Sequence, residues 1–528
     1  MLDGSGAGKS SAYSIPNAYQ CLGSYIFTDP KGELYDKTAG YLKSKGYEIK
    51  VLNLVQPQFS DGYNPLMHIN SELDVDVIAS TIVKGQKSGE GSDPYWDDMA
   101  EMLLKALIYY LIATRPEEEQ NLASCSELVR AANNNGGGNL LSELIGQLPF
   151  DHPARMYYKS IEIAPEKTYG SILSTLQSKL GKFDSKEIAE VTSTNTIDFD
   201  EIGSKKTAVY VISSDTHTAY DFLLTIFFSQ MIQQLYTYAD DRGGALPVPA
   251  FFILDEFANI GKIPDFDKKI STSRSRKISF SVILQNLDQL EAVYEKSYET
   301  IIGNCDTHVF LGSNSQKTVE YFSKALGEKT ITRDSRSISR DKQNHKQGFN
   351  DSDQIMARAL MTPDELRRFD NNMCIIFEKG IRPVKANKFY YFKHKNMLDE
   401  ITRVAINHNE LGNRDRGKWR KYNPYNPYVE EKDEEKENDS LEVESLDDLF
   451  DDVSDEVPTE NKVEEKPAEK KEEVKMASQP NSEIDINNLF EDDLEEAPQM
   501  PEADEDEFDL QKELEAKFDE LFGPIDEE

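Results

Sequence analysis

The stretch Gly4-Ser5-Gly6-Ala7-Gly8-Lys9-Ser10 lies near the start of the chain and is typical of a loop that binds phosphate. Glycines let backbone N–H groups approach phosphate oxygens, because no Cβ atom stands in the way. We predict that the whole stretch binds a nucleoside triphosphate. Lys9 would reach its terminal phosphates, and the Ser10 hydroxyl would be a ligand of Mg²⁺.

A second stretch far downstream, Phe251-Phe252-Ile253-Leu254-Asp255-Glu256, is an apolar run that ends in two carboxylates. Such a run is typical of a buried strand, which places both acids at the carboxyl end of that strand. We predict that Asp255 serves the metal and that Glu256 polarises the water that attacks the phosphate. Together with the glycine-rich stretch, this pair predicts an ATP-hydrolysing site.

Two features of the glycine-rich stretch depart from the usual pattern. Asp3 occupies the position of the first glycine, and its carboxylate would either point away from the phosphates or weaken the loop. Only Met1 and Leu2 stand where a buried strand is expected, which indicates a truncated N-terminus that a membrane anchor could have preceded. The alternative interpretation is a flexible leader rich in glycine and serine.

The net charge of −37 is divided unevenly along the 528 residues. Residues 429–528 carry 41 acidic and 9 basic side chains, and therefore −32 of that charge. Because they also contain few aromatic residues, we predict a disordered acidic tail. The pairs Leu449-Phe450, Leu489-Phe490 and Leu521-Phe522 lie among its acids and favour docking motifs, with a solubilising spacer as the alternative.

The composition also bounds the environment of the chain. Its four cysteines lie far apart and show no metal-type pairing, which predicts a reduced, cytosolic environment. No run approaches the ~20 apolar residues that a membrane span requires.

Apolar runs alternate with helical patterns in most of the chain, which indicates a parallel α/β sheet. Strands are expected at residues 25–28, 47–54, 207–212, 251–254, 278–284, 307–311 and 373–377. Elsewhere, as in Trp96 to Ile112, apolar residues recur at helical spacing. The resulting division is an α/β core in two parts (1–70 and 192–395), an inserted all-α domain (71–191), and a linker (396–428).

Three groups of polar residues have more than one interpretation. Residues 414–422 mix basic and aromatic side chains, which suits either nucleic-acid binding or a solvated linker. An arginine of Ser271 to Lys277 could reach a neighbouring subunit's γ-phosphate, contact DNA, or be surface charge. Gln285 follows a buried run, where its amide could sense the γ-phosphate or orient water.

These motifs belong to an ordered set that resembles the type IV coupling proteins of conjugation, in the TraG-like branch typical of Gram-positive mobile elements. The resemblance covers roughly residues 3–395. The set consists of Asp29-Pro30-Lys31-Gly32-Glu33, Asn64-Pro65-Leu66, Asp93-Pro94-Tyr95-Trp96, Leu254-Asp255-Glu256-Phe257, Ile260-Gly261-Lys262-Ile263-Pro264, Ser273-Arg274-Ser275-Arg276, Leu284-Gln285 and Asn304-Cys305.

The resemblance implies a RecA-like nucleotide-binding core, with an inserted all-α domain that reads the substrate. It implies a homo-hexamer at the cytoplasmic face of the membrane that uses ATP and Mg²⁺ to deliver relaxase-bound single-stranded DNA to type IV secretion channel components. Arg274 matches the arginine finger that acts in trans, and Gln285 matches the sensor glutamine. The family's N-terminal membrane helices have no counterpart in this sequence.

Two other functions remain open at this point. A non-hydrolysing scaffold would recruit relaxase and channel components and bind ATP poorly. A chromosome-partition translocase would have a related motor, but the Asp29 to Glu33 motif and the large helical insertion count against it.

Overall fold

The computed structural model describes residues 1–3, 8–85, 94–133, 140–214, 220–340, 347–404, 410 and 414–427. Of residues 3, 133, 333–340 and 347–354 it describes the backbone alone. The predicted acidic tail with its Leu-Phe pairs, and the loop residues Gly4 to Ala7, lie outside this part of the chain.

Five parallel strands form the centre of the fold, in the order β3-β4-β2-β5-β6. They are β2 (Ser24–Thr28), β3 (Glu48–Asn53), β4 (Thr207–Ile212), β5 (Ala250–Leu254) and β6 (Ile278–Val282). The apolar runs of β2 and β4 are buried along their whole length, as expected for a parallel sheet that is covered on both faces. Tyr25 and Phe27 pack into one core cluster and Ile26 into the other, because successive side chains of a strand face opposite sides.

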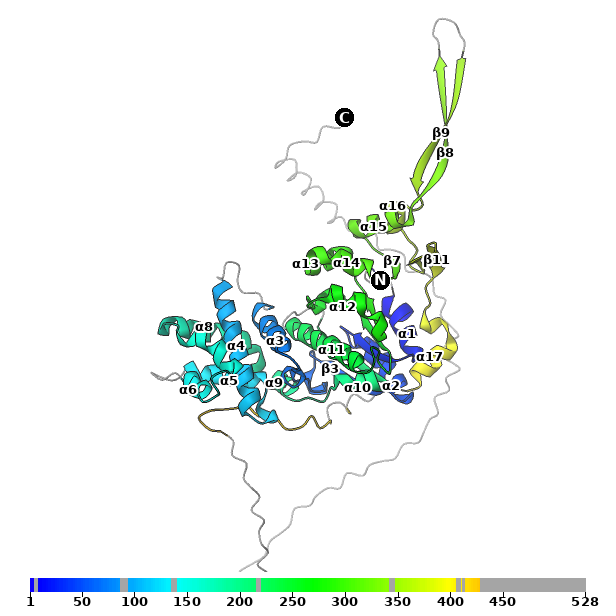
Figure 1. Cartoon of the computed structure of the whole chain (residues 1–528). Coiled ribbons are helices and arrows are strands. Elements are labelled where there is room, and N and C mark those ends of the chain that lie inside the picture. Colours follow the sequence, from blue (N-terminus) through cyan, green and yellow to red (C-terminus); the bar gives the residue numbers. More distant parts are fainter. Residues whose placement is uncertain are drawn as a thin grey trace, which may run out of the picture. The chain divides into compact units, whose positions relative to one another are not determined.

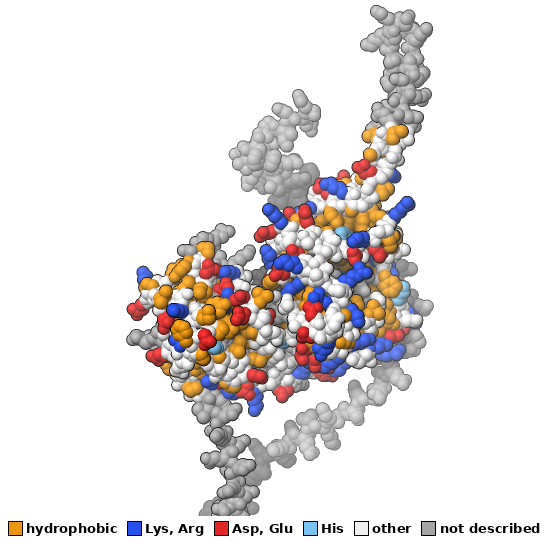
Figure 2. Space-filling view, in the orientation of Figure 1, with side chains coloured by type: hydrophobic (Ala, Val, Ile, Leu, Met, Phe, Trp, Pro, Cys, Tyr) orange, Lys and Arg blue, Asp and Glu red, His pale blue; other side chains and the backbone are white. Residues whose placement is uncertain are grey.

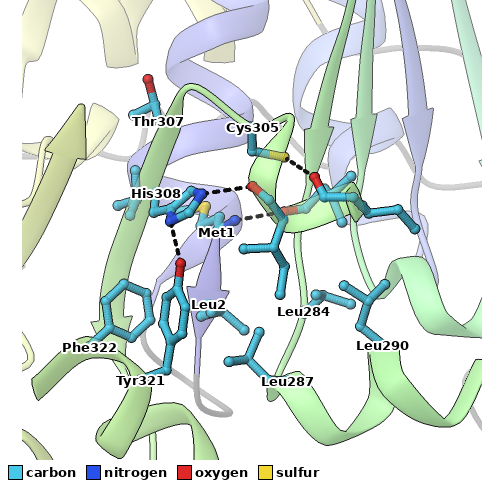
Figure 3. Close-up of a pocket in the computed structure, with 14 residues that line it drawn as sticks. Met1, Leu2, Leu284, Leu287, Leu290, Cys305, Thr307, His308, Tyr321 and Phe322 are labelled. Atoms are coloured by element: carbon cyan, nitrogen blue, oxygen red, sulfur yellow. Dashed lines mark hydrogen bonds between the residues drawn. The ribbon is translucent and has the colours of Figure 1, made fainter. Parts of the chain in front are cut away.

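A second sheet continues from the first, in the order β1-β7-β10-β11. Its strands are β1 (Leu2–Asp3), β7 (Thr307–Gly312), β10 (Met373–Glu378) and β11 (Val384–Asn387). The Met1 ammonium donates to the Val282 carbonyl at 2.7 Å, and the Leu284 N–H donates to the Met1 carbonyl at 3.0 Å. The first residues of the chain therefore lie between β6 and β7 and join the two sheets (Figure 3).

Strand β10 differs from the expected parallel arrangement, because it runs antiparallel to both β7 and β11. Its sequence could not show this, since the apolar pattern of a strand does not depend on the direction of its neighbours.

Helices cover both faces of the sheets (Figure 1). They are α1 (Ile15–Tyr19), α2 (Glu33–Ser44), α3 (Glu72–Lys84), α4 (Pro94–Thr114), α5 (Leu122–Asn133), α6 (Leu140–Gly146), α7 (Pro153–Glu162), α8 (Glu166–Leu180), α9 (Lys186–Ser193), α10 (Phe199–Ser204), α11 (Asp221–Asp241), α12 (Phe266–Thr272), α13 (Leu287–Tyr294), α14 (Tyr298–Gly303), α15 (Gln316–Leu326), α16 (Pro363–Arg367) and α17 (Lys395–Thr402).

The part of the chain from α3 to α9 contains helices and no strand among its described residues. A capping box of Ser71 and Asp74 begins α3, and α4 packs against α3, α5, α7 and α8. Figure 2 shows hydrophobic side chains on the surface of this helical part. The boundaries 71–191 of a separate all-α domain stay a prediction. Among the residues described, none of the helices is both long and apolar enough to span a membrane.

A long hairpin projects from the body of the protein and was not foreseen (Figure 1). Its strands are β8 (Glu328–Arg340) and β9 (Gln347–Ala359), which pair antiparallel from Glu328↔Ala359 to Arg340↔Gln347. The sequence of this hairpin is largely polar, so it lacks the apolar alternation that identifies a half-buried strand.

Residues 414–427, here called the strap, run along the body rather than away from it. Arg414 forms an ion pair with Asp61 at 2.8 Å, and Asp61 is 2% exposed. Arg420 donates to Glu119 at 2.8 Å, and Glu119 is 1% exposed. Tyr422 is also buried. Both interpretations of residues 414–422 are therefore wrong for these side chains, because internal acids bind the arginines.

Candidate nucleotide site

The two halves of the predicted nucleotide site meet in the folded chain. Lys9 Nζ lies 2.9 Å from Asp255 Oδ1 and 3.4 Å from Glu256 Oε1. Asp255 directly follows β5, and Lys9 lies between the left-handed Gly8 (φ +85°) and the helix η1 (Ser10–Ser14). Both stretches thus lie at the carboxyl ends of parallel strands, where α/β sheets bind their ligands.

Asp255 is an unusual carboxylate, because it is only 6% exposed. Burial raises its pKa, and the nearby Lys9 ammonium opposes that rise. Among the described residues, Oδ1 receives no hydrogen bond of regular geometry, so the ion pair with Lys9 is its polar contact. A buried oxygen in this state is suited to bind a cation.

Glu256 has a strained backbone and several side-chain contacts. Its φ of +51° is uncommon for a residue with a Cβ atom, and such strain concentrates at functional sites. This conformation turns the chain from β5 into the helix η6 (Phe257–Ile260). Gln285 Nε2 donates to Glu256 Oε1 at 3.3 Å, so the predicted sensor glutamine lies beside the predicted water-polarising acid.

Two residues of the site were missed by the sequence analysis. Asn259 Nδ2 donates to Glu256 Oε2 at 3.1 Å and so fixes the second oxygen of that carboxylate. Thr28 Oγ1 donates to the Asp255 carbonyl at 2.7 Å, which ties the end of β2 to the end of β5. Asn259 could have been found from its position three residues after Glu256. No sequence signal connects Thr28 with Asp255.

Ser10 is half-buried and begins η1 directly after Lys9. Its hydroxyl and the Asp255 carboxylate are oxygen donors, which is the ligand type that Mg²⁺ requires. Because Gly4 to Ala7 lie outside the described residues, the binding of phosphate by residues 4–10 stays a prediction.

Arg274 is not brought to this site within one chain. It lies on η7 (Arg274–Arg276), before β6, and the first residue of β6 pairs with Ala250, the first residue of β5. The length of β5 therefore separates Arg274 from Asp255 by roughly 13 Å or more. Arg274 is exposed and lines a groove of about 670 Å³, whereas Arg276 forms a bidentate ion pair with Asp240.

A small apolar cavity of about 40 Å³ lies beside the first two residues of the chain. Met1, Leu2, Leu284 and Phe322 are among its lining residues (Figure 3). His308 is also among its lining residues: its Nε2 donates to the Ile302 carbonyl at 3.0 Å, and its Nδ1 lies 3.0 Å from the Tyr321 hydroxyl. These side chains pack around the first two residues of the chain, Met1 and Leu2.

Known proteins of one family are similar to this chain. A family model described as "Type IV secretory system Conjugative DNA transfer" matches residues 1–413. The protein VirD4 of Rhizobium radiobacter is 23% identical over 414 residues, which are 74% of this chain and 56% of VirD4. The conjugal transfer protein TraG of Escherichia coli is 26% identical over 385 residues, which are 69% of this chain and 60% of TraG.

Solved structures show the same fold at low sequence identity. The unbound bacterial conjugative coupling protein TrwB, lacking its first 70 residues, is 18% identical, with a TM-score of 0.52 over 73% of this chain and 83% of that one. The plasmid coupling protein TrwB in complex with ADP and Mg²⁺ is 17% identical, also with a TM-score of 0.52, over 73% of this chain and 83% of that one.

The chain belongs to the family of type IV secretory system conjugative DNA transfer proteins, because the family model covers well over half of its length. The predicted α/β, RecA-like fold class is confirmed by the TrwB structures. The placement in a Gram-positive branch stays a prediction. The chain spans 56–60% of the length of the VirD4 and TraG relatives described above.

Proposed function

We propose that this protein is an ATP-hydrolysing coupling protein, which recruits relaxase-bound single-stranded DNA and drives it to a type IV secretion channel. The observation that carries the proposal is the meeting of Lys9 with Asp255 and Glu256. Family membership supports the DNA-transfer role. The TrwB complex with ADP and Mg²⁺ supports the choice of nucleotide and metal.

The contacts of Lys9 suggest how the site responds to ATP. Its ammonium neutralises the buried Asp255 and contacts Glu256 in the structure described above. When a triphosphate binds, its greater negative charge would draw the ammonium towards the phosphate oxygens and free both carboxylates. Asp255 and the Ser10 hydroxyl would then hold Mg²⁺, which neutralises charge on the phosphates when bound.

Glu256 is the residue that we expect to act on water. Its carboxylate would accept a hydrogen bond from the water that attacks the γ-phosphate in line. Asn259 and Gln285 fix the two oxygens of this carboxylate, so that its orientation is set before the nucleotide arrives. Gln285 would also sense the γ-phosphate, since its amide lies beside the same carboxylate.

We further propose a homo-hexamer that is anchored at the cytoplasmic face of the membrane. Because Arg274 lies at the opposite edge of the sheet from Lys9, it can stabilise charge only on a nucleotide held by another subunit. Its exposure and its position on the groove beside β6 support a role at a subunit interface.

ATP turnover, measured with and without single-stranded DNA, tests the proposal. We expect Lys9→Ala and Glu256→Gln to reduce turnover by at least ~10²-fold, because each removes a group that acts on the reacting phosphate. Lys205→Ala is the matched control, since Lys205 is an exposed lysine that is paired with Glu201 on the surface. Unchanged turnover in the first two variants would refute the ATPase assignment. Poor ATP binding with retained relaxase binding would favour the non-hydrolysing scaffold.

A further inference from the structure

An aromatic segment, Phe389 to His394, lies against Gly8, near the end of the proposed phosphate-binding stretch. A Cβ atom at Gly8 would come within 2.9 Å of Tyr390 Cε1, so the Tyr390 ring touches the glycine itself. The helix η9 (Tyr391–Lys393) also contacts η1, which follows Lys9. The segment is therefore within the span of a nucleotide whose phosphates lie at Lys9.

The inner side of this segment is fixed by packing. Tyr391 is 8% exposed and belongs to the core cluster that α1 and α2 share with the sheet. The Tyr390 hydroxyl donates to the Asn371 carbonyl at 3.2 Å, and Lys393 Nζ lies 4.7 Å from the centre of the Tyr390 ring. One face of Tyr390 is thus covered by a cation and its edge is held by the backbone.

Phe392 is a ring of this segment that the packing around Tyr390 leaves exposed. It is 47% exposed, its centre lies 5.2 Å from that of Tyr390, and Tyr391 packs against it edge to face. A lone exposed phenylalanine needs no explanation. This one is supported by two other rings, and one of them, Tyr390, touches Gly8 beside Lys9, so a planar ligand could stack on Phe392 without moving the protein.

We propose that Phe392, supported by Tyr390, is the platform on which the base of the bound nucleotide stacks. This inference rests on the proposed ATP-binding function and adds the residue that holds the nucleoside end. Every base has a π-face, and stacking on an aromatic side chain is tolerant of base identity. ATP and GTP should therefore depend on Phe392 to the same extent.

Calorimetric titration with ATP, GTP and inorganic triphosphate, each with Mg²⁺, tests the proposal. We expect Phe392→Ala to weaken ATP and GTP binding roughly 5- to 100-fold, because the stack is lost, and to leave triphosphate binding unchanged. Phe392→Trp should retain nucleotide affinity. Phe389→Ala is the matched control, since Phe389 is equally exposed (46%) and its ring stacks on His394 instead.

Lys9→Ala separates this inference from the function on which it rests, because it should weaken ATP and triphosphate alike. If Lys9→Ala has that effect while Phe392→Ala leaves ATP affinity within twofold, the platform is wrong and the nucleotide site stands. Equal losses of ATP and triphosphate in Phe392→Ala would also overturn the platform, since they would indicate a general support of the loop. A wild-type protein that binds neither ligand would overturn both proposals.

Discussion

At the scale of single residues, Asp29 shows how the edge of the nucleotide core is built at an electrostatic cost. It follows β2, is 3% exposed, and its Oδ2 accepts a hydrogen bond from the Tyr35 N–H at 2.8 Å. Burial raises the pKa of Asp29 from its ordinary value of 3.8 to about 6, although the backbone hydrogen bonds at the start of α2 lower it. At neutral pH the Asp29 side chain is therefore ionised, although a neutral side chain at this position would make the folded protein more stable.

Asp29→Asn should make the protein more stable at neutral pH. Because the pKa of Asp29 is higher in the folded than in the unfolded state, its favourable contribution is present at low pH and is lost as the pH rises through about 6. We expect the variant to gain up to about 3 kcal/mol in unfolding free energy at pH 8 and less than about 1 kcal/mol at pH 4.

Chemical denaturation at both pH values measures this difference. Asp36→Asn is the control, because Asp36 is an exposed carboxylate in the first turn of the neighbouring helix α2. An equal change for Asp29→Asn at pH 4 and pH 8 would contradict the role of burial.

At the scale of elements, the strap connects two parts of the protein that are far apart in sequence. Arg414 contacts Asp61 and the Ile49 carbonyl near the start of β3, and Arg420 contacts the turn between α4 and α5. The Tyr422 N–H donates to Ser124 on α5 at 2.9 Å. The strap is therefore a further connection between the sheet and the helical part, besides the chain crossings near Gly62 and Thr196.

Arg414→Ala should destabilise the protein by about 2–4 kcal/mol, because it leaves the buried Asp61 carboxylate without its cation. Adding Asp61→Asn should recover part of the loss, since no unpaired charge then remains. Lys418→Ala, at an exposed position of the same strap, should have little effect. The measurement is the denaturant midpoint of five proteins: the wild type, Arg414→Ala, Asp61→Asn, their double variant and Lys418→Ala. A loss in the double variant equal to the sum of the two single losses would exclude the coupling.

At the scale of the whole molecule, the sheet separates the groups that ATP hydrolysis would require. Lys9, Asp255 and Glu256 lie at its carboxyl edge, and Arg274 precedes the opposite end of β6. In the proposed ring, each subunit would hold Lys9 and the two acids for one nucleotide and would offer Arg274 to the nucleotide of its neighbour.

Mixing two inactive variants tests this arrangement. We expect Lys9→Ala and Arg274→Ala each to abolish most ATP turnover, and a mixture of the two to recover part of it. Recovery is expected because some interfaces then combine an intact Lys9 with an intact Arg274 from the neighbour. Arg403→Ala is a suitable control, since Arg403 is an exposed arginine at the end of α17. An inactive mixture that still assembles would contradict a trans-acting Arg274.

The sequence by itself determined the features that depend on neighbouring residues. The run Phe251 to Leu254 had to be a buried strand, and the acids after it had to lie at the carboxyl edge of the sheet, because strand periodicity is a local property. The glycine-rich stretch before Lys9 indicated that this lysine belongs to the same site as the two acids, because a phosphate-binding pattern consists of consecutive residues.

Only the tertiary structure decided which distant groups meet. The burial of Asp61 and Glu119 turned the strap arginines into internal partners, although their sequence equally suited nucleic acid. The contact of Tyr390 with Gly8, the antiparallel direction of β10 and the support of Asp255 by Thr28 likewise join residues far apart in the chain. The physical reason is that hydrogen bonding and desolvation depend on which surfaces pack together, and no single stretch of sequence contains both surfaces.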